Sequence, residues 1–149
     1  MTGAVTGKPI WWEIGPDDIV AVDLPDEQRE LMIKALSLWG GPTRPTDTIA
    51  RAMGFANADA IEGDGERLRT ALGERRGVSM RDWARALVAT EIVYGSSYYG
   101  AGTDWDCVTG WSDEHTLPVL RSLQRSLGGL RAPPRHIGGL QDPFAEPDD

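Results

Sequence analysis

Glu91 is the residue whose position most directly suggests chemistry. It lies in an apolar stretch that predicts a helix from Ser79 to about Tyr94. On a helical wheel it falls about 20° from Met80, near the centre of the face expected to be buried. An unpaired buried carboxylate costs several kcal/mol or stays protonated. We therefore expect Glu91 either to accept hydrogen bonds from a Trp or Tyr, from an Arg or from the backbone of the following loop, or to act as a general acid or base. We favour the structural role, in which Glu91 anchors the loop.

The wheel divides this helix into two faces. The expected buried face holds Met80, Trp83, Ala84, Leu87, Val88, Glu91 and Tyr94. The expected outer face holds Asp82, Arg85, Ala89 and Val93. Glu91 is thus the only acid that this pattern places in the core.

Two aspartates in the following loop, Asp104 and Asp106, could join Glu91 at one site. In an extended segment, residues i and i+2 project to the same side, so the three carboxylates could converge on a hard cation. The remaining ligands of a helix–loop–helix calcium site are missing, and aspartates beside glycines are common turn formers. We expect no bound metal, and we keep a ligand-binding or metal-dependent enzyme site on these three residues as an alternative.

The other catalytic patterns in the chain are incomplete. Cys107 and His115 form a nucleophile–base pair only by nearness in sequence, so we expect a small packing residue and a surface residue. The glycines of Gly100–Gly102 lack the third glycine of the dinucleotide fingerprint and the context that it requires. No cofactor is predicted. Glu91 and His115 are the two catalytic candidates that we retain.

Aromatic residues bracket the same loop, and they either pack it onto the helices or face a partner. Tyrosine and tryptophan combine a large apolar surface with a polar tip, and they are enriched at interface hot spots. The binding candidates in and beside the loop are Tyr98, Tyr99, Asp104, Trp105, Asp106 and Trp111. A contiguous exposed cluster of these side chains would indicate a binding surface.

The elements that must position these residues are mainly helical. Periodicity and capping signals predict helices near 24–39, 46–53, 59–76, 79–94 and 112–128, the last kinked at Pro118 or starting at Thr116. Two short strands, Ile10–Ile14 and Ile19–Val22, flank a Gly-Pro-Asp turn. We expect a compact bundle of four to five helices with an N-terminal β-hairpin or extended segment. Residues 1–8 are expected to be flexible, 9–130 to form one helical domain, and 131–149 to be a disordered Pro/Gly-rich acidic tail.

The composition disfavours several classes of partner. The 149 residues carry a formal net charge of −8, which repels nucleic acid and anionic membranes and favours a basic protein partner. The single cysteine allows no intrachain disulfide, and no segment has the pattern of a signal peptide or a membrane span. We expect a cytoplasmic, soluble protein. Its oligomeric state stays open, since the Trp11–Trp12 strand could pair with a second chain.

Thr46–Ile61 resembles a bacterial helix-turn-helix over about sixteen residues. Gly54 follows Ala50 by four positions, which fits the tight turn of that motif. The segment that would read DNA, Asn57–Glu66, is acidic and carries no Lys or Arg. We therefore interpret the two helices as a structural unit that packs within the protein rather than against DNA.

These observations favour a small acidic helical protein that acts by binding or inhibiting a basic partner such as a toxin or nuclease. The alternatives are the enzyme or ligand site at Glu91 and a degenerate helix-turn-helix regulator.

Overall fold

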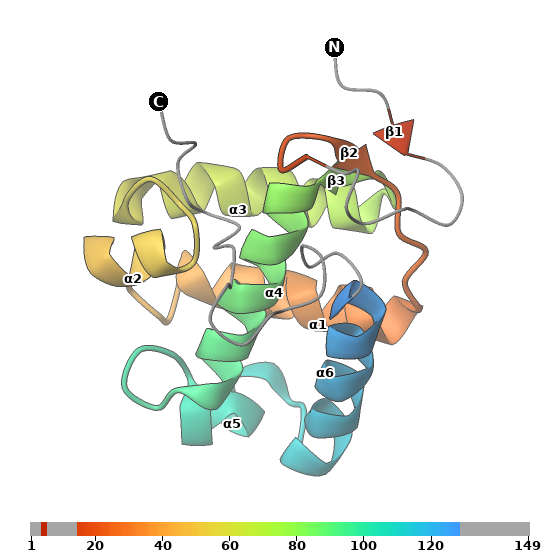
Figure 1. Cartoon of the computed structure of the whole chain (residues 1–149). Coiled ribbons are helices and arrows are strands. Elements are labelled where there is room, and N and C mark those ends of the chain that lie inside the picture. The colour runs from red at the N-terminus through yellow and green to blue at the C-terminus, as the bar shows by residue number, and fades with distance from the viewer. Residues whose placement is uncertain (1–3, 6–14, 129–149) are drawn as a thin grey trace, which may run out of the picture.

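The computed structural model describes residues 4–5 and 15–128. Within them the fold is mainly helical, as predicted, and Figure 1 shows the helices gathered around α4. The helices are α1 (Asp26–Trp39), α2 (Asp47–Ala52), α3 (Ala58–Gly73), α4 (Met80–Gly95), α5 (Trp105–Thr109) and α6 (Asp113–Gly128), with a 3₁₀ turn η2 (Gly102–Asp104) before α5. None of these helices is both long and apolar enough to cross a membrane.

Three two-residue strands form a small sheet in the order β1 (Ala4–Val5), β2 (Ile19–Val20) and β3 (Val78–Ser79). β1 runs parallel to β2, and β3 runs antiparallel to it with Val20 opposite Val78. The predicted second strand is therefore present. The predicted first strand, 10–14, and the predicted tail, 131–149, lie outside the described residues, whereas β1 falls within the segment 1–8 expected to be flexible.

Local capping explains where the helices begin. Thr46, Asn57 and Ser79 each accept a hydrogen bond at the N-terminus of α2, α3 and α4, from a backbone N–H three residues ahead. The residue before α1 is Pro25, which provides no side-chain cap. The last helix starts after Ser112, as predicted by the first of the two alternatives, and the alternative start at Thr116 is wrong.

The first turn of α6 explains that start. The Oγ of Ser112 accepts from the His115 N–H at 3.2 Å, and its carbonyl accepts from the Thr116 N–H at 2.9 Å. Pro118 then lies inside the helix. Its missing N–H leaves unpaired a backbone carbonyl in the exposed first turn of α6, where water can bind it.

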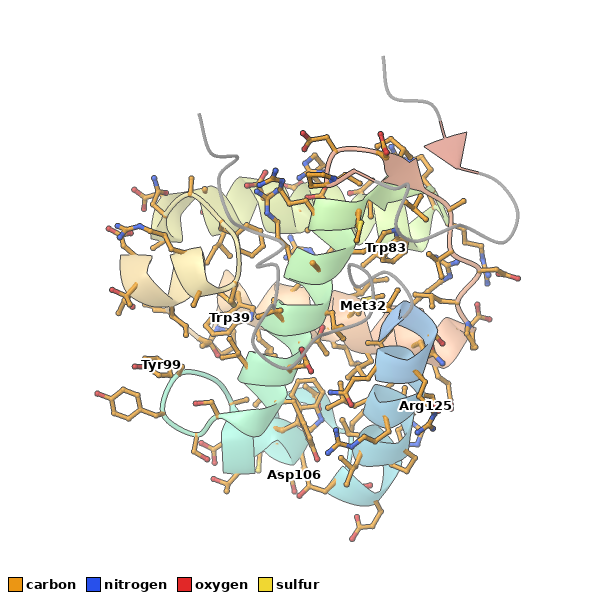
Figure 2. The ribbon with its side chains drawn as sticks, in the orientation of Figure 1. Met32, Trp39, Trp83, Tyr99, Asp106 and Arg125 are labelled. Atoms are coloured by element: carbon orange, nitrogen blue, oxygen red, sulfur yellow. The ribbon has the colours of Figure 1, made fainter. Side chains whose placement is uncertain are left out.

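The core forms where α4 packs against α1, α6 and β3, while α1 also contacts α3. Three tryptophans are almost fully buried, and each indole N–H finds an acceptor. Trp39 donates to the carbonyl of Ala89 at 3.0 Å, and Trp83 donates to the carbonyl of Val20 at 2.9 Å. These bonds join α1 and β2 to the central helix, and Figure 2 shows both side chains beside α4.

α4 is buried on more sides than a single apolar stripe would allow. Asp82, Ala89 and Val93, which the wheel placed outside, are buried, whereas Glu91 is only half-buried. A helix with neighbours on several sides must bury residues around most of its circumference. The wheel assumed one covered face, and that assumption was wrong.

Arg29 of α1 is a buried cation that fixes the chain before this helix. Its guanidinium donates to the carbonyls of Leu24 at 3.1 Å, Val22 at 3.2 Å and Leu72 at 3.3 Å. Burial lowers the pKa of Arg29, and the positive charge of Arg75 lowers it further. Since Leu72 belongs to the last turn of α3, the cation also interacts favourably with the negative end of that helix.

Candidate functional site

Glu91 is anchored, but its partner is not the loop. Its Oε2 accepts from the side-chain amide of Gln124 on α6 at 2.7 Å. The Oε1 of Gln124 in turn accepts from Arg121 at 2.8 Å. Glu91 therefore links α4 to α6 by a hydrogen bond. The prediction that its donor would come from the following loop was wrong.

The buried acid of α4 is Asp82, whose side chain is 9% exposed. Arg67 of α3 binds it with both terminal nitrogens, at 2.8 and 3.2 Å, and Arg85 adds a third bond at 3.1 Å. Burial by itself raises the pKa of Asp82, but the hydrogen bonds and charges of the two arginines outweigh it, so the pKa is lowered. Asp82 is thus a charged structural link between α3 and α4.

Asp104 and Asp106 lie in helical rather than extended backbone. Asp104 ends the 3₁₀ turn η2 and Asp106 is the second residue of α5. Residues two apart on an α-helix point about 200° apart, so these carboxylates diverge. Across residues 4–5 and 15–128, no three His, Cys, Asp or Glu side chains form a group that could hold a metal ion. The convergence with Glu91 that a metal site requires is therefore absent from this part of the chain.

The loop after α4 is held tightly against the end of that helix. The Ala101 N–H donates to the carbonyl of Val93 at 2.7 Å, and the Gly100 N–H donates to the carbonyl of Ser96 at 3.0 Å. A Cβ on Gly100 would lie only 2.5 Å from the Cα of Val93, closer than real side chains approach. Backbone contact of this kind fixes the loop, which we call the tyrosine loop (Ser96–Gly102).

The far side of the tyrosine loop is closed by Ser97. Its Oγ accepts from the Thr103 N–H at 3.2 Å. Gly102 has a φ of +48°, and a side chain there would collide with Ser97. Both ends of the loop are therefore fixed, one to α4 and the other to η2, by contacts that require glycine.

Tyr98 and Tyr99 project from this fixed backbone into solvent. Tyr98 is 88% exposed and Tyr99 is 45% exposed. Their rings meet edge to face, with centroids 4.8 Å apart and planes at 81°. Figure 2 shows Tyr99 pointing outward from the loop, away from α4. Asp104 and Asp106, two further predicted binding residues, are also exposed.

Trp105 does not belong to that surface, because it is fully buried and donates its indole N–H to Thr116 at 2.8 Å. Tyr94 packs edge-on against Trp105, with ring centroids 5.4 Å apart. The Tyr94 hydroxyl donates to Asp113 at 3.0 Å, and burial raises the pKa of Tyr94, with Asp113 adding to the rise. Trp105 was predicted to contact a binding partner. The structure instead buries it in the core between α5 and α6.

Trp111 and His115 form a separate contact between α6 and α1. Their rings lie 4.5 Å apart, and the ammonium of Lys34 sits over Trp111 at 5.8 Å from the ring centroid. The Nε2 of His115 is 3.9 Å from a carboxylate oxygen of Glu27. The half-buried Trp111 thus packs against His115 and Lys34 of the same chain. His115 is exposed, as expected.

Cys107 is an exposed thiol on α5. The negative charge of Asp106 raises its pKa, with contributions from a hydrogen bond to the same carboxylate and from Asp104. A raised pKa keeps the thiol protonated near neutral pH, which weakens it as a nucleophile. It is not the buried apolar filler that we expected.

The sequence contains a further signal of a binding surface that pattern reasoning missed. From Ala86 to Leu120 there are five acidic residues and no Lys or Arg. This stretch, the acidic segment, includes the end of α4, the tyrosine loop, α5 and the start of α6, which Figure 1 shows at one end of the molecule. Arg67 and Arg69 lie on α3 and Arg81 lies in the first turn of α4, and Figure 1 shows α3 at the opposite end of the molecule. The part of the sequence that contains Tyr98 and Tyr99 therefore carries acidic residues and no basic residue.

A pocket of about 270 Å³ lies elsewhere, between α1 and α3. It is lined by Leu36, Ser37, Gly40, Ile61, Glu62 and Arg69. Arg69 already donates to the carbonyl of Leu36 at 3.3 Å. This pocket includes none of the predicted site residues.

The segment Thr46–Ile61 forms α2 and the start of α3. α2 and α3 are joined by a tight turn in which Gly54 has a φ of +91°. The exposed side of α3 carries Asp59, Glu62 and Glu66, and a surface of this charge repels the phosphate backbone. Comparison of the chain with protein-family models, curated proteins and solved structures gave no match, so the geometry alone carries the functional assignment.

Proposed function

We propose that this protein is a binding protein that docks a basic protein partner through the tyrosine loop and the acidic segment around it. The observation that carries the proposal is the 88% exposure of Tyr98 on a loop whose backbone is fixed at both ends. A fixed loop loses little conformational entropy on binding, so the rings contribute more of their contact energy to affinity.

The type of residue supports the same proposal. Tyrosine provides a large, stiff contact surface and is enriched at interface hot spots. Tyr98 is 88% exposed and its ring meets that of Tyr99, so burial in the core does not explain why a tyrosine stands at position 98. Val108 of α5, 41% exposed, adds apolar surface in the same segment.

The charge of the segment indicates the partner. Acidic residues from Glu91 to Glu114 are not balanced by any Lys or Arg between Ala86 and Leu120. A partner with a positive surface would be attracted over about 10 Å at moderate ionic strength and would associate faster at low salt. Inhibition of a basic enzyme by coverage of its surface would be one consequence of such docking.

Site-specific photo-crosslinking tests this proposal. A photoreactive phenylalanine analogue at Tyr98 should crosslink a basic protein in cells, and the same analogue at the exposed Thr70 of α3 should not. The double variant Asp104→Asn/Asp106→Asn should reduce the crosslink. Glu62→Gln/Glu66→Gln removes the same charge from exposed positions on α3 and should leave it unchanged. The proposal would be refuted if positions 98 and 70 crosslinked partners equally well, or if the protein crosslinked to position 98 were acidic.

A further inference from the structure

We propose that the Tyr98–Tyr99 pair is an arginine-binding subsite, which receives a guanidinium group from the partner. This inference rests on the proposed function and names the chemistry that the docking surface recognises. It uses three observations: the mutual geometry of the two rings, the exposure of Tyr98, and the exposed carboxylate of Asp104, which follows the fixed loop.

The rings form an open aromatic corner. Their planes meet at 81° with centroids 4.8 Å apart, and Tyr98 is almost fully exposed. A ring face attracts a cation through its quadrupole. The same interaction occurs within this chain, where the guanidinium of Arg85 lies over the ring of Phe55 at 5.7 Å. The exposed face of Tyr98 is free to make an equivalent contact with a partner.

Asp104 is the first exposed carboxylate after the loop. Ser97, which precedes Tyr98, is in direct contact with Gly102, and Asp104 follows Gly102 by two residues in a 3₁₀ turn. Such a turn rises about 2 Å per residue, so Asp104 stays near the base of the loop. Within the described part of the chain, Asp104 forms no ion pair and its side chain accepts no hydrogen bond. Its oxygens therefore remain available to a ligand.

These groups fit arginine better than lysine. A guanidinium is planar, so it can stack on a tyrosine ring while its edge donates to a carboxylate. A lysine ammonium is a compact, strongly hydrated charge that gains less from the ring face. The surrounding negative charge attracts both residues, so the preference for arginine must come from the tyrosines.

Titration with short peptides separates the two contributions. The probes are an oligo-arginine and an oligo-lysine peptide of equal length and charge, with binding measured calorimetrically at low and physiological ionic strength. The arginine peptide should bind about five-fold more tightly, as expected for one or two cation–π contacts. Tyr98→Ala/Tyr99→Ala should abolish that preference, whereas Tyr98→Phe/Tyr99→Phe should retain it. All four substitutions are at exposed positions, and unchanged melting temperatures would verify the fold.

Charge variants distinguish failure of this inference from failure of the proposed function. Asp104→Asn/Asp106→Asn should weaken both peptides more than Glu62→Gln/Glu66→Gln does. If the two charge variants act equally, the tyrosine loop is not the docking surface and the proposed function fails. If they differ but the wild-type protein binds both peptides equally, or the alanine variant keeps the arginine preference, only the arginine subsite is refuted.

Discussion

Replacement of Asp82 by asparagine should destabilise the protein mainly through the loss of one buried negative charge. The wild-type carboxylate accepts three hydrogen bonds from Arg67 and Arg85, at 2.8 to 3.2 Å. Hydrogen bonds to charged groups contribute about 1.5–3 kcal/mol. Asparagine keeps the shape and one acceptor, and the side chain of Arg67 is 50% exposed, so solvent screens part of the interaction. We expect a loss of about 2 kcal/mol, or about 4–8 °C in melting temperature for a chain of this size.

The stability that the Asp82 charge contributes should depend on pH in a definite direction. The pKa of Asp82 is lowered from 3.8 in the folded protein, so the folded state binds the proton more weakly than the unfolded chain does. The stability due to the charge is therefore fully present well above pH 3.8 and is lost as the pH falls through the folded pKa. The difference between wild type and Asp82→Asn should accordingly shrink in acid.

Urea denaturation followed by far-ultraviolet circular dichroism, repeated from neutral pH to about pH 3, measures both effects. Asp64→Asn is the control, because Asp64 contacts the same Arg67 at 3.4 Å from a more exposed position and should change stability by less than about 0.5 kcal/mol. A loss of less than about 0.5 kcal/mol for Asp82→Asn at neutral pH would refute the reasoning. A loss that stays constant in acid would show that the charge does not cause it.

Three further experiments test other parts of the structure. Gly100→Ala should displace the tyrosine loop and cost several kcal/mol, whereas Gly95→Ala, which meets no atom within 4 Å, should be neutral or mildly stabilising, as thermal denaturation would show. Glu91→Gln should change stability by less than about 0.5 kcal/mol, because the new amide oxygen can still accept from Gln124; a larger loss would mean that the charge itself is needed. Arg29→Met removes three hydrogen bonds to backbone carbonyls and should cost about 2–4 kcal/mol in urea denaturation, and a neutral result would contradict its role as a clamp.

Features that depend on one element alone could be predicted from the sequence. Leu31, Ala35 and Leu38 follow the period of a helix with one covered face, and all three are buried in α1. Ser79 lies three residues before Asp82, and its hydroxyl accepts the Asp82 N–H at 3.0 Å as the capping pattern predicts. In each case the stabilising contact lies within one turn of helix.

Features that depend on contacts between elements could not be predicted. The partners of Glu91 and Asp82 come from α6 and α3, and no spacing along α4 encodes them. The short helix α5 was missed because its glycine- and aspartate-rich surroundings are typical of turns. The sequence does contain one sign of this helix, which is the glycine at position 110. Gly110 ends α5 with a φ of +76°, a conformation that glycine commonly adopts after the last residue of a helix.

The steric arrangement of the tyrosine loop separates structural from functional constraint during evolution. Gly100 and Gly102 cannot accept a side chain without moving α4 or Ser97, so any descendant that keeps this fold must keep them whatever it binds. The fold does not require a tyrosine at position 98, because the side chain of Tyr98 is 88% exposed. Among diverged copies of this chain, fixed glycines around a variable position 98 would mean that only the scaffold is inherited. A tyrosine that persists there would record selection by a partner.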